Sequence, residues 1–242
     1  MAAEKGHLQV LQWARGQGCP WSEETCALAA EGGHLDVLQW AQGQWCPWDE
    51  RTCMYAAEEG HLEVLQWARG QGCPWDEVVC ATAAWRGQFS ALQWLRTQGC
   101  PWDARACAAA AGGGRLEILQ WLRAEGCPWD ETACELAAFG GNLAVLQWTR
   151  AQGCPWDEAT CTAAALTGNV NVLQWARANG CPWDEGAYLG RITALEGHEW
   201  VRGQPLWVRV AALGCPAQVW RAYENGTSYL VRRVGGQWEP LH

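Results

Sequence analysis

The sequence predicts an all-α fold, a solenoid of about seven stacked helix pairs that ends in a small C-terminal segment. The first observation is a period of 27 residues, which repeats without a shift. The second is a skewed composition of 20 Trp, 14 Cys and 28 Gly among 242 residues, typical of one short segment copied many times. The cysteine that marks the period occurs at Cys19, Cys46, Cys73, Cys100, Cys127, Cys154 and Cys181.

Each unit carries the start and stop signals of two short helices, as in the copy that begins at Asp49. Asp49 is placed to cap the first helix by accepting bonds from free amides, and Glu50 suits the positive end of the helix dipole. Gly60 ends this helix, where a left-handed residue is needed. The second helix is expected over about residues 61–69, because apolar residues recur there at helical spacing, and Gly72 ends it.

Stacking between units must supply the core, because two helices of about ten residues cannot bury their apolar faces alone. Residues 1–199 are therefore predicted to form the repeat solenoid, which opens with a half unit at Met1–Glu4. The last copy departs from the pattern at Tyr188 and Gly197. Terminal repeats are expected to be atypical, since one of their faces meets water.

Residues 200–242 lose the period and are predicted to form a divergent C-terminal segment. This segment is either a cap for the solenoid or decayed repeat sequence. Leu206–Val210 is expected to be a strand, and Val219–Val234 a β-hairpin that turns at Asn225-Gly226.

The chain is acidic, with 17 Lys and Arg against 26 Asp and Glu and a formal net charge of −9. An acidic solenoid repels phosphate groups, which argues against nucleic acid and anionic membranes as partners. Residues 1–10 lack the features of a signal peptide, and no apolar run approaches the ~20 residues of a membrane span. The cysteines are then expected to be reduced thiols. We therefore expect an intracellular, cytoplasmic protein that is not secreted, in the host cytoplasm if the chain is viral.

The repeat unit resembles the ankyrin repeat. Gly-His-Leu-Glu-Val-Leu at residues 60–65 matches the second helix of that family, and Thr-Cys-x-x-Ala-Ala at residues 52–57 matches the end of its first helix. The unit is shorter than the usual 33 residues, and the missing residues fall in the projecting hairpin that should begin near residues 72–76. The chain is more similar still to the short Cys-Pro-Trp variety found in giant DNA viruses, algae and oomycetes. The resemblance covers residues 5 to about 184 and implies protein–protein interaction through the concave face.

A cysteine-rich metal-binding or redox array is the alternative to a binding scaffold. Within a unit, Cys19 and Cys26 are seven residues apart, whereas zinc motifs pair cysteines two to four residues apart. Equivalent cysteines in stacked units lie roughly 10 Å apart, too far for a disulfide. We therefore expect buried structural thiols, with no metal and no cofactor.

No catalytic residues are expected. His7, His34 and His61 begin second helices, but Gln, Arg or Asn takes that place in later copies, which indicates a hydrogen-bonding role. Asp and Glu recur as helix-start residues, and no unique cluster combines a nucleophile with a base. An enzyme would need a unique pocket near residues 185–210.

Positions that differ between copies are not needed to hold the fold, so their residues can determine which partner binds. These positions cluster on the first helix and its end. Because the units stack in register, the residues at one such position form a row along the concave face of the array. Exposed aromatic residues and Arg dominate binding energies. We therefore predict a monomer that binds another protein through the concave surface, using Arg51, Tyr55, Trp85, Arg86, Arg105 and Phe139. The alternative is neutral drift at solvated positions.

Overall fold

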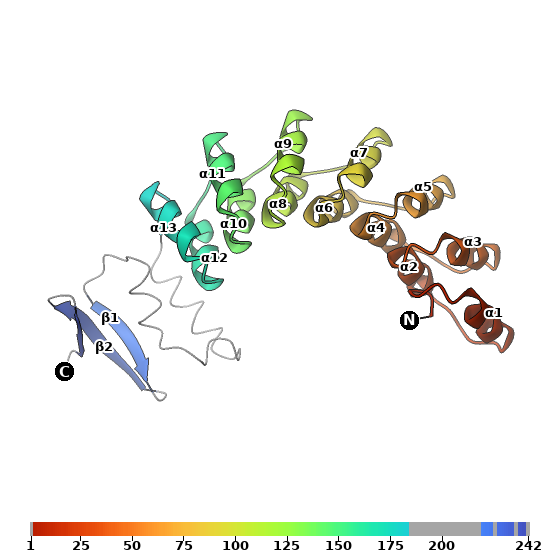
Figure 1. Ribbon diagram of the computed structural model, residues 1–242, viewed down its shortest axis with the longest axis horizontal. Helices are drawn as coiled ribbons and strands as arrows, with labels where there is room; N and C mark the ends of the chain where they lie inside the picture. Colours follow the sequence, from red (N-terminus) through yellow and green to blue (C-terminus); the bar gives the residue numbers. More distant parts are fainter. Residues whose placement is uncertain (1, 184–218, 225–226, 235–236, 241–242) are drawn as a thin grey trace.

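Thirteen helices and three strands make up the part of the chain described by the computed structural model, residues 2–183, 219–224, 227–234 and 237–240. The first helices of the pairs are α2 (Glu23–Glu31), α4 (Glu50–Glu59), α6 (Glu77–Arg86), α8 (Ala104–Gly112), α10 (Glu131–Phe139) and α12 (Glu158–Leu166). The second helices are α1 (Leu8–Gly16), α3 (Leu35–Gly43), α5 (Leu62–Gly70), α7 (Phe89–Thr97), α9 (Leu116–Ala124), α11 (Leu143–Ala151) and α13 (Val170–Ala178). The pairs stack side by side into a curved array (Figure 1). The predicted helix-pair solenoid is confirmed over these residues.

The predicted helix signals act as expected. The Asp49 carboxylate accepts a hydrogen bond from the Arg51 amide at 3.1 Å, which caps α4. Equivalent aspartates cap the four following first helices, whereas Ser22 makes no side-chain cap bond at the start of α2. Gly60 ends α4 in the left-handed region at φ 78°. Each first helix is therefore held in length by residues that the repeat keeps constant.

Trp45 occupies a backbone position that suits glycine. The other copies place a left-handed glycine there, such as Gly72 at φ 84°, but Trp45 adopts φ 60°. A bulky side chain in this region is strained, and Trp45 is 91% exposed. Burial of the ring therefore does not offset the strain of this backbone conformation.

Small residues let the first helices pack directly on one another. Two alanines recur near the end of each first helix, and in α4 both Ala56 and Ala57 are fully buried. The first helices contact one another in order from α2 to α12, while the second helices touch each other far less. The array therefore curves with the first helices on its inner side (Figure 1).

Tryptophan and arginine side chains occupy the wider, outer side. The loop residue Trp48 meets Trp67 of α5 edge-on, with ring centroids 5.8 Å apart. The Arg69 guanidinium lies over the ring of Trp75 in the next loop, 4.1 Å from its centroid. The same arrangement recurs along the array. These large groups keep the second helices apart, whereas alanines draw the first helices together.

The core between the two layers combines leucine with buried thiols. Leu65 of α5 is fully buried, as are Leu38, Leu92, Leu119 and Leu146 at the same repeat position. The Cys73 thiol donates to the Asp49 carbonyl oxygen at 3.5 Å, which ties a loop to the cap of the preceding first helix. Five other loop cysteines make the equivalent contact.

A ladder of hydrogen bonds joins successive units at the start of the second helices. The His61 Nε2 lies 3.0 Å from the Glu31 carbonyl oxygen of the preceding unit. The Asn142 Nδ2 donates to the carbonyl oxygens of Ala111 and Gly112 at 3.1 and 2.8 Å. His34, Gln88, Arg115 and Asn169 make equivalent contacts. The hydrogen-bonding role predicted for this position is confirmed.

Three strands form an antiparallel sheet near the C-terminus: β1 (Val219–Glu224), β2 (Thr227–Val234) and β3 (Gln237–Pro240). β1 pairs with β2, and Trp220 lies opposite Val231 in the register. The divergent last copy at residues 184–199, the predicted strand Leu206–Val210, the turn at Asn225-Gly226 and the predicted domain boundary near residue 200 lie outside the described residues. Among the described helices, none is long and apolar enough to cross a membrane.

Candidate functional site

The inner side of the array presents the exposed residues that vary between copies. Trp85 and Phe139 occupy one repeat position, at or next to the ends of α6 and α10, and are 41% and 51% exposed. Arg86 and Arg105 are exposed, whereas Arg51 and Tyr55 are half-buried on α4. The structure thus places all six predicted residues on first helices.

Trp85 lies across the end of the next first helix. A Cβ atom added to Gly112 would stand 2.4 Å from the Trp85 ring atom Cζ3 and 3.2 Å from the Leu136 Cβ. A Cβ on Gly113 would stand 2.3 Å from the Trp85 carbonyl oxygen. The glycines of α8 therefore make room for the indole, which packs between α6 and α10.

An apolar patch follows from this packing. It lies on the inner side from α6 to α12 and consists of Trp85, Gly112, Leu136, Phe139 and Leu166. Trp85 and Phe139 occupy the same repeat position two units apart, and the Trp85 ring packs over Gly112 of the unit between them. Exposed aromatic side chains can bind a bulky apolar group of a partner.

The three predicted arginines are already paired with carboxylates. The pairs are Arg51 with Asp49, Arg86 with Glu58 and Glu59, and Arg105 with Asp103 and Glu77. Two of these arginines bridge neighbouring units. The hydrogen bond from Arg86 to Glu58 and the charge of that carboxylate raise the pKa of the guanidinium. The arginines are therefore held in position and keep their charge.

Charge divides between the two helix layers. Among residues 2–183, the first helices and their capping residues carry 15 acidic and three basic residues, a net charge of −12. The second helices and their capping residues carry four acidic and seven basic residues, a net charge of +3. Six of those seven arginines lie over tryptophan rings. The inner side of the array is thus strongly acidic.

The cysteines form pairs that the sequence analysis missed. Cys53 of α4 and Cys73 of the following loop interact through their thiols, 20 residues apart in the chain. The hydrogen bond to Cys53, followed by burial, raises the pKa of the Cys73 thiol. Five further pairs interact through their thiols, and in the Cys107–Cys127 pair the helix thiol is the one whose pKa is raised. The hydrogen bond between Cys53 and Cys73 lowers the pKa of the Cys53 thiol, so the thiolate is disfavoured only on Cys73.

The geometry gives no support to the metal-binding alternative. In the part of the chain that the structure describes, no three His, Cys, Asp or Glu side chains gather where they could hold a metal ion. A structural zinc site needs four such ligands. The cysteine pairs instead occupy the core as buried, hydrogen-bonded thiols.

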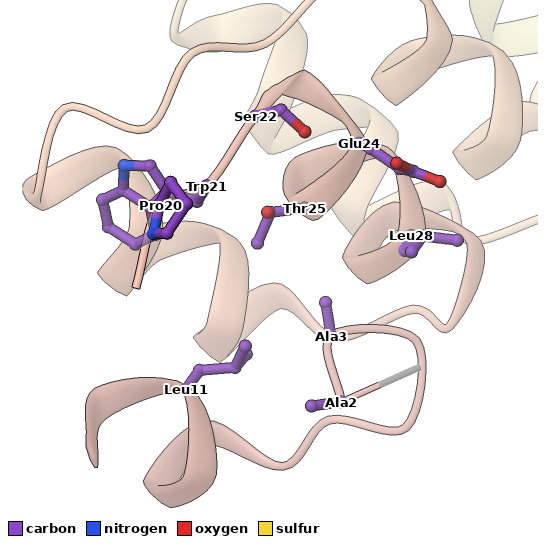
Figure 2. A pocket seen from close by; sticks show the side chains of 9 residues that line it. All are labelled: Ala2, Ala3, Leu11, Pro20, Trp21, Ser22, Glu24, Thr25 and Leu28. Atoms are coloured by element: carbon purple, nitrogen blue, oxygen red, sulfur yellow. The ribbon is translucent and has the colours of Figure 1, made fainter. Parts of the chain in front are cut away.

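A pocket opens at the first half unit. It lies between the turn at Ala2 and Ala3, Leu11 of α1, and Thr25 and Leu28 of α2 (Figure 2). In the next unit, the first turns of α2 fill the equivalent place and bury the matching Leu38 and Thr52. The pocket therefore lies at the place that the start of a first helix fills in the other units. Glu24 lies in the lining beside the hydroxyl residues Ser22 and Thr25, and no histidine, cysteine or lysine is among the residues that line this pocket.

Comparisons with known proteins agree with this geometry. Residues 53–96 match the family model of ankyrin repeats (many copies). Among solved structures, the chain is similar to the crystal structure of the human ASB11 ankyrin repeat domain, with a TM-score of 0.50 and 17% identity over 64% of this chain and 83% of that chain. Among curated proteins, none matches the chain. The family match and the shared fold support ankyrin repeats in this chain, and arrays of these repeats are generally non-enzymatic modules for protein interaction.

Proposed function

We propose that the chain is a non-catalytic scaffold that binds a partner protein through the concave surface of its stacked first helices. The observation that carries this proposal is the division of the repeat between constant and variable positions. Leu65 is the same in all copies and is fully buried, and Asp49, which is replaced in the copy with Ser22, caps α4. Among the residues that change on the first helices, Trp85 and Phe139 lie exposed on the inner side.

Rigid presentation is the mechanism we propose. Caps, the hydrogen-bond ladder and the inter-unit ion pairs hold the inner side in one conformation. A preformed surface avoids much of the entropy cost of ordering on binding. Affinity then depends on a few anchors, for which we nominate Arg51, Tyr55, Trp85, Arg86, Arg105 and Phe139.

The buried thiols suit a reducing compartment. We therefore expect the scaffold to act as a monomer in the cytoplasm, where thiols stay reduced. Membership of the short Cys-Pro-Trp repeat variety, and an origin in a giant virus, an alga or an oomycete, also remain predictions. The same holds for the exclusion of nucleic acid, which the acidic inner side supports.

A comparison of two variants tests the proposal. The first carries Trp85→Ala, Arg86→Ala and Phe139→Ala on the inner side. The matched control carries Gln66→Ala, Gln93→Ala and Gln120→Ala, three exposed positions of the second helices. Each is used as bait in native-source lysate beside the unaltered chain, once circular dichroism shows equal helix content.

The proposal expects proteins retained by the unaltered chain to stay bound to the control and to be lost from the inner-side variant. Retention by all three baits would place binding on another face. Loss from both variants, with both still folded, would also contradict the proposed site.

A further inference from the structure

The inner side, as formed by the first helices α2 to α12, lacks a positive charge that is free of a carboxylate partner. Its net charge is −12 among residues 2–183, and each of its three arginines is paired with a carboxylate. Six of the seven other arginines within residues 2–183 lie over tryptophan rings on the outer side. The field in front of the inner side is therefore negative, and a negative groove raises the local concentration of positive groups.

The acidic residues flank the apolar patch. Glu58 and Glu59 lie at the end of α4, just before the unit of Trp85. Glu135 is on α10, four residues before Phe139. A partner that reaches the aromatic side chains therefore passes close to the carboxylates of Glu58 and Glu59 on α4 and of Glu135 on α10.

The apolar patch carries no charge. Gly112 is buried against the Trp85 ring, while Leu136 and Phe139 of the next unit remain partly or largely exposed. A small polar residue of a partner would gain little there. A bulky apolar side chain would cover Leu136 and the exposed face of Phe139, and apolar burial of this kind supplies most of the energy at binding hot spots.

From these three observations we infer that the partner contributes a basic segment with a bulky apolar side chain near its centre. This inference rests on the proposed function and specifies its partner. The first helices from α4 to α12 are separated by four steps between units, a distance of roughly 40 Å. An extended chain covers this span with about 12 residues. Lysine or arginine of the segment faces Glu135 and the cluster of Glu58 and Glu59, whose two negative charges are offset only in part by Arg86. The apolar residue of the segment lies between Trp85 and Phe139.

The test uses a library of random 16-residue peptides displayed on phage and selected against the full chain. Selected sequences should be enriched in Lys and Arg and in aromatic residues or Leu, relative to the unselected library. One enriched peptide is then synthesised, and its Kd is measured by fluorescence polarisation at low and high salt. Affinity should fall about tenfold between 50 and 300 mM NaCl, because salt screens attraction between exposed charges.

Two variants with the same change in net charge locate the effect. The inner variant carries Glu58→Gln, Glu59→Gln and Glu135→Gln. The outer control carries Asp36→Asn, Glu63→Gln and Glu117→Gln, all exposed on second helices. The inner variant should bind the peptide about tenfold more weakly, and the control should stay within about twofold of the unaltered chain, since its charges face away from the peptide.

The outcomes separate this inference from the proposed function. Selected peptides without basic enrichment that still depend on Trp85 and Phe139 would overturn the basic partner and leave the concave binding surface standing. Basic peptides that bind the two charge variants and a Trp85→Ala, Phe139→Ala variant with equal affinity would overturn the inferred partner and the proposed binding surface together. A selection that yields no binding peptide would overturn the inference, because a linear basic segment would then find no site.

Discussion

Asn142→Asp isolates the hydrogen-bond ladder that joins the units. The two side chains have nearly the same shape, but a carboxylate cannot donate. The change removes the bonds from Asn142 Nδ2 to the carbonyl oxygens of Ala111 and Gly112, which measure 3.1 and 2.8 Å. Each neutral hydrogen bond contributes about 0.5–1.5 kcal/mol, so the loss is about 1–3 kcal/mol before repulsion between the carboxylate and the two carbonyl oxygens is added.

Equilibrium unfolding in urea, followed by circular dichroism, measures this loss. Asn142→His is the matched control, because His34 and His61 fill the same place and contact the preceding unit at 3.0 Å. The histidine variant should unfold within about 0.5 kcal/mol of the unaltered chain. The aspartate variant should unfold at lower urea, with a broadened transition if the units on either side of α11 lose their coupling. Equal midpoints for the two variants would refute the ladder as a stabilising contact.

Three further changes probe the repeat. Trp45→Gly should stabilise the protein by about 0.5–1 kcal/mol in the same unfolding assay, because it removes the strain of a tryptophan in the left-handed region and loses only an exposed ring. The greater freedom of glycine in the unfolded chain offsets part of this gain. A loss of stability would contradict the strain. Asp76→Ala should cost about 1 kcal/mol and Ser22→Ala almost nothing, since only the aspartate makes a cap bond; similar costs would show that capping is not the cause. N-ethylmaleimide added to the native protein should label Cys19 and leave the twelve buried cysteines of residues 26–181 unmodified, as read by peptide mass mapping; rapid labelling of Cys73 would show that the core is open.

The regular features of the fold follow from local sequence rules. The aspartate before five of the six first helices, the left-handed glycine after each of them and the 27-residue period predict the helices to within a residue or two of their observed bounds. These rules work because caps and glycine turns depend on a few neighbouring residues. The histidines were also interpreted correctly, since copies with Gln, Arg and Asn restrict that position to hydrogen bonding.

Contacts between distant residues could not be obtained in this way. The pairing of Cys53 with Cys73 joins a helix to the loop after the next helix, so it needs the three-dimensional path of the chain. The fit of Trp85 over Gly112 is of the same kind, although the alternation of a large and a small residue at one repeat position was visible in the sequence. The division of charge between the layers was also accessible, because it follows from sorting charged residues by repeat position.

Photo-crosslinking tests the central claim, binding on the concave face, most directly. A benzoylphenylalanine replaces Tyr55, Phe139 or, as control, Gln93 on the outer side, and the protein is irradiated in native-source lysate. The account predicts that a partner protein is captured from positions 55 and 139 and not from position 93. Capture from position 93 alone would contradict the account and assign binding to the outer helices.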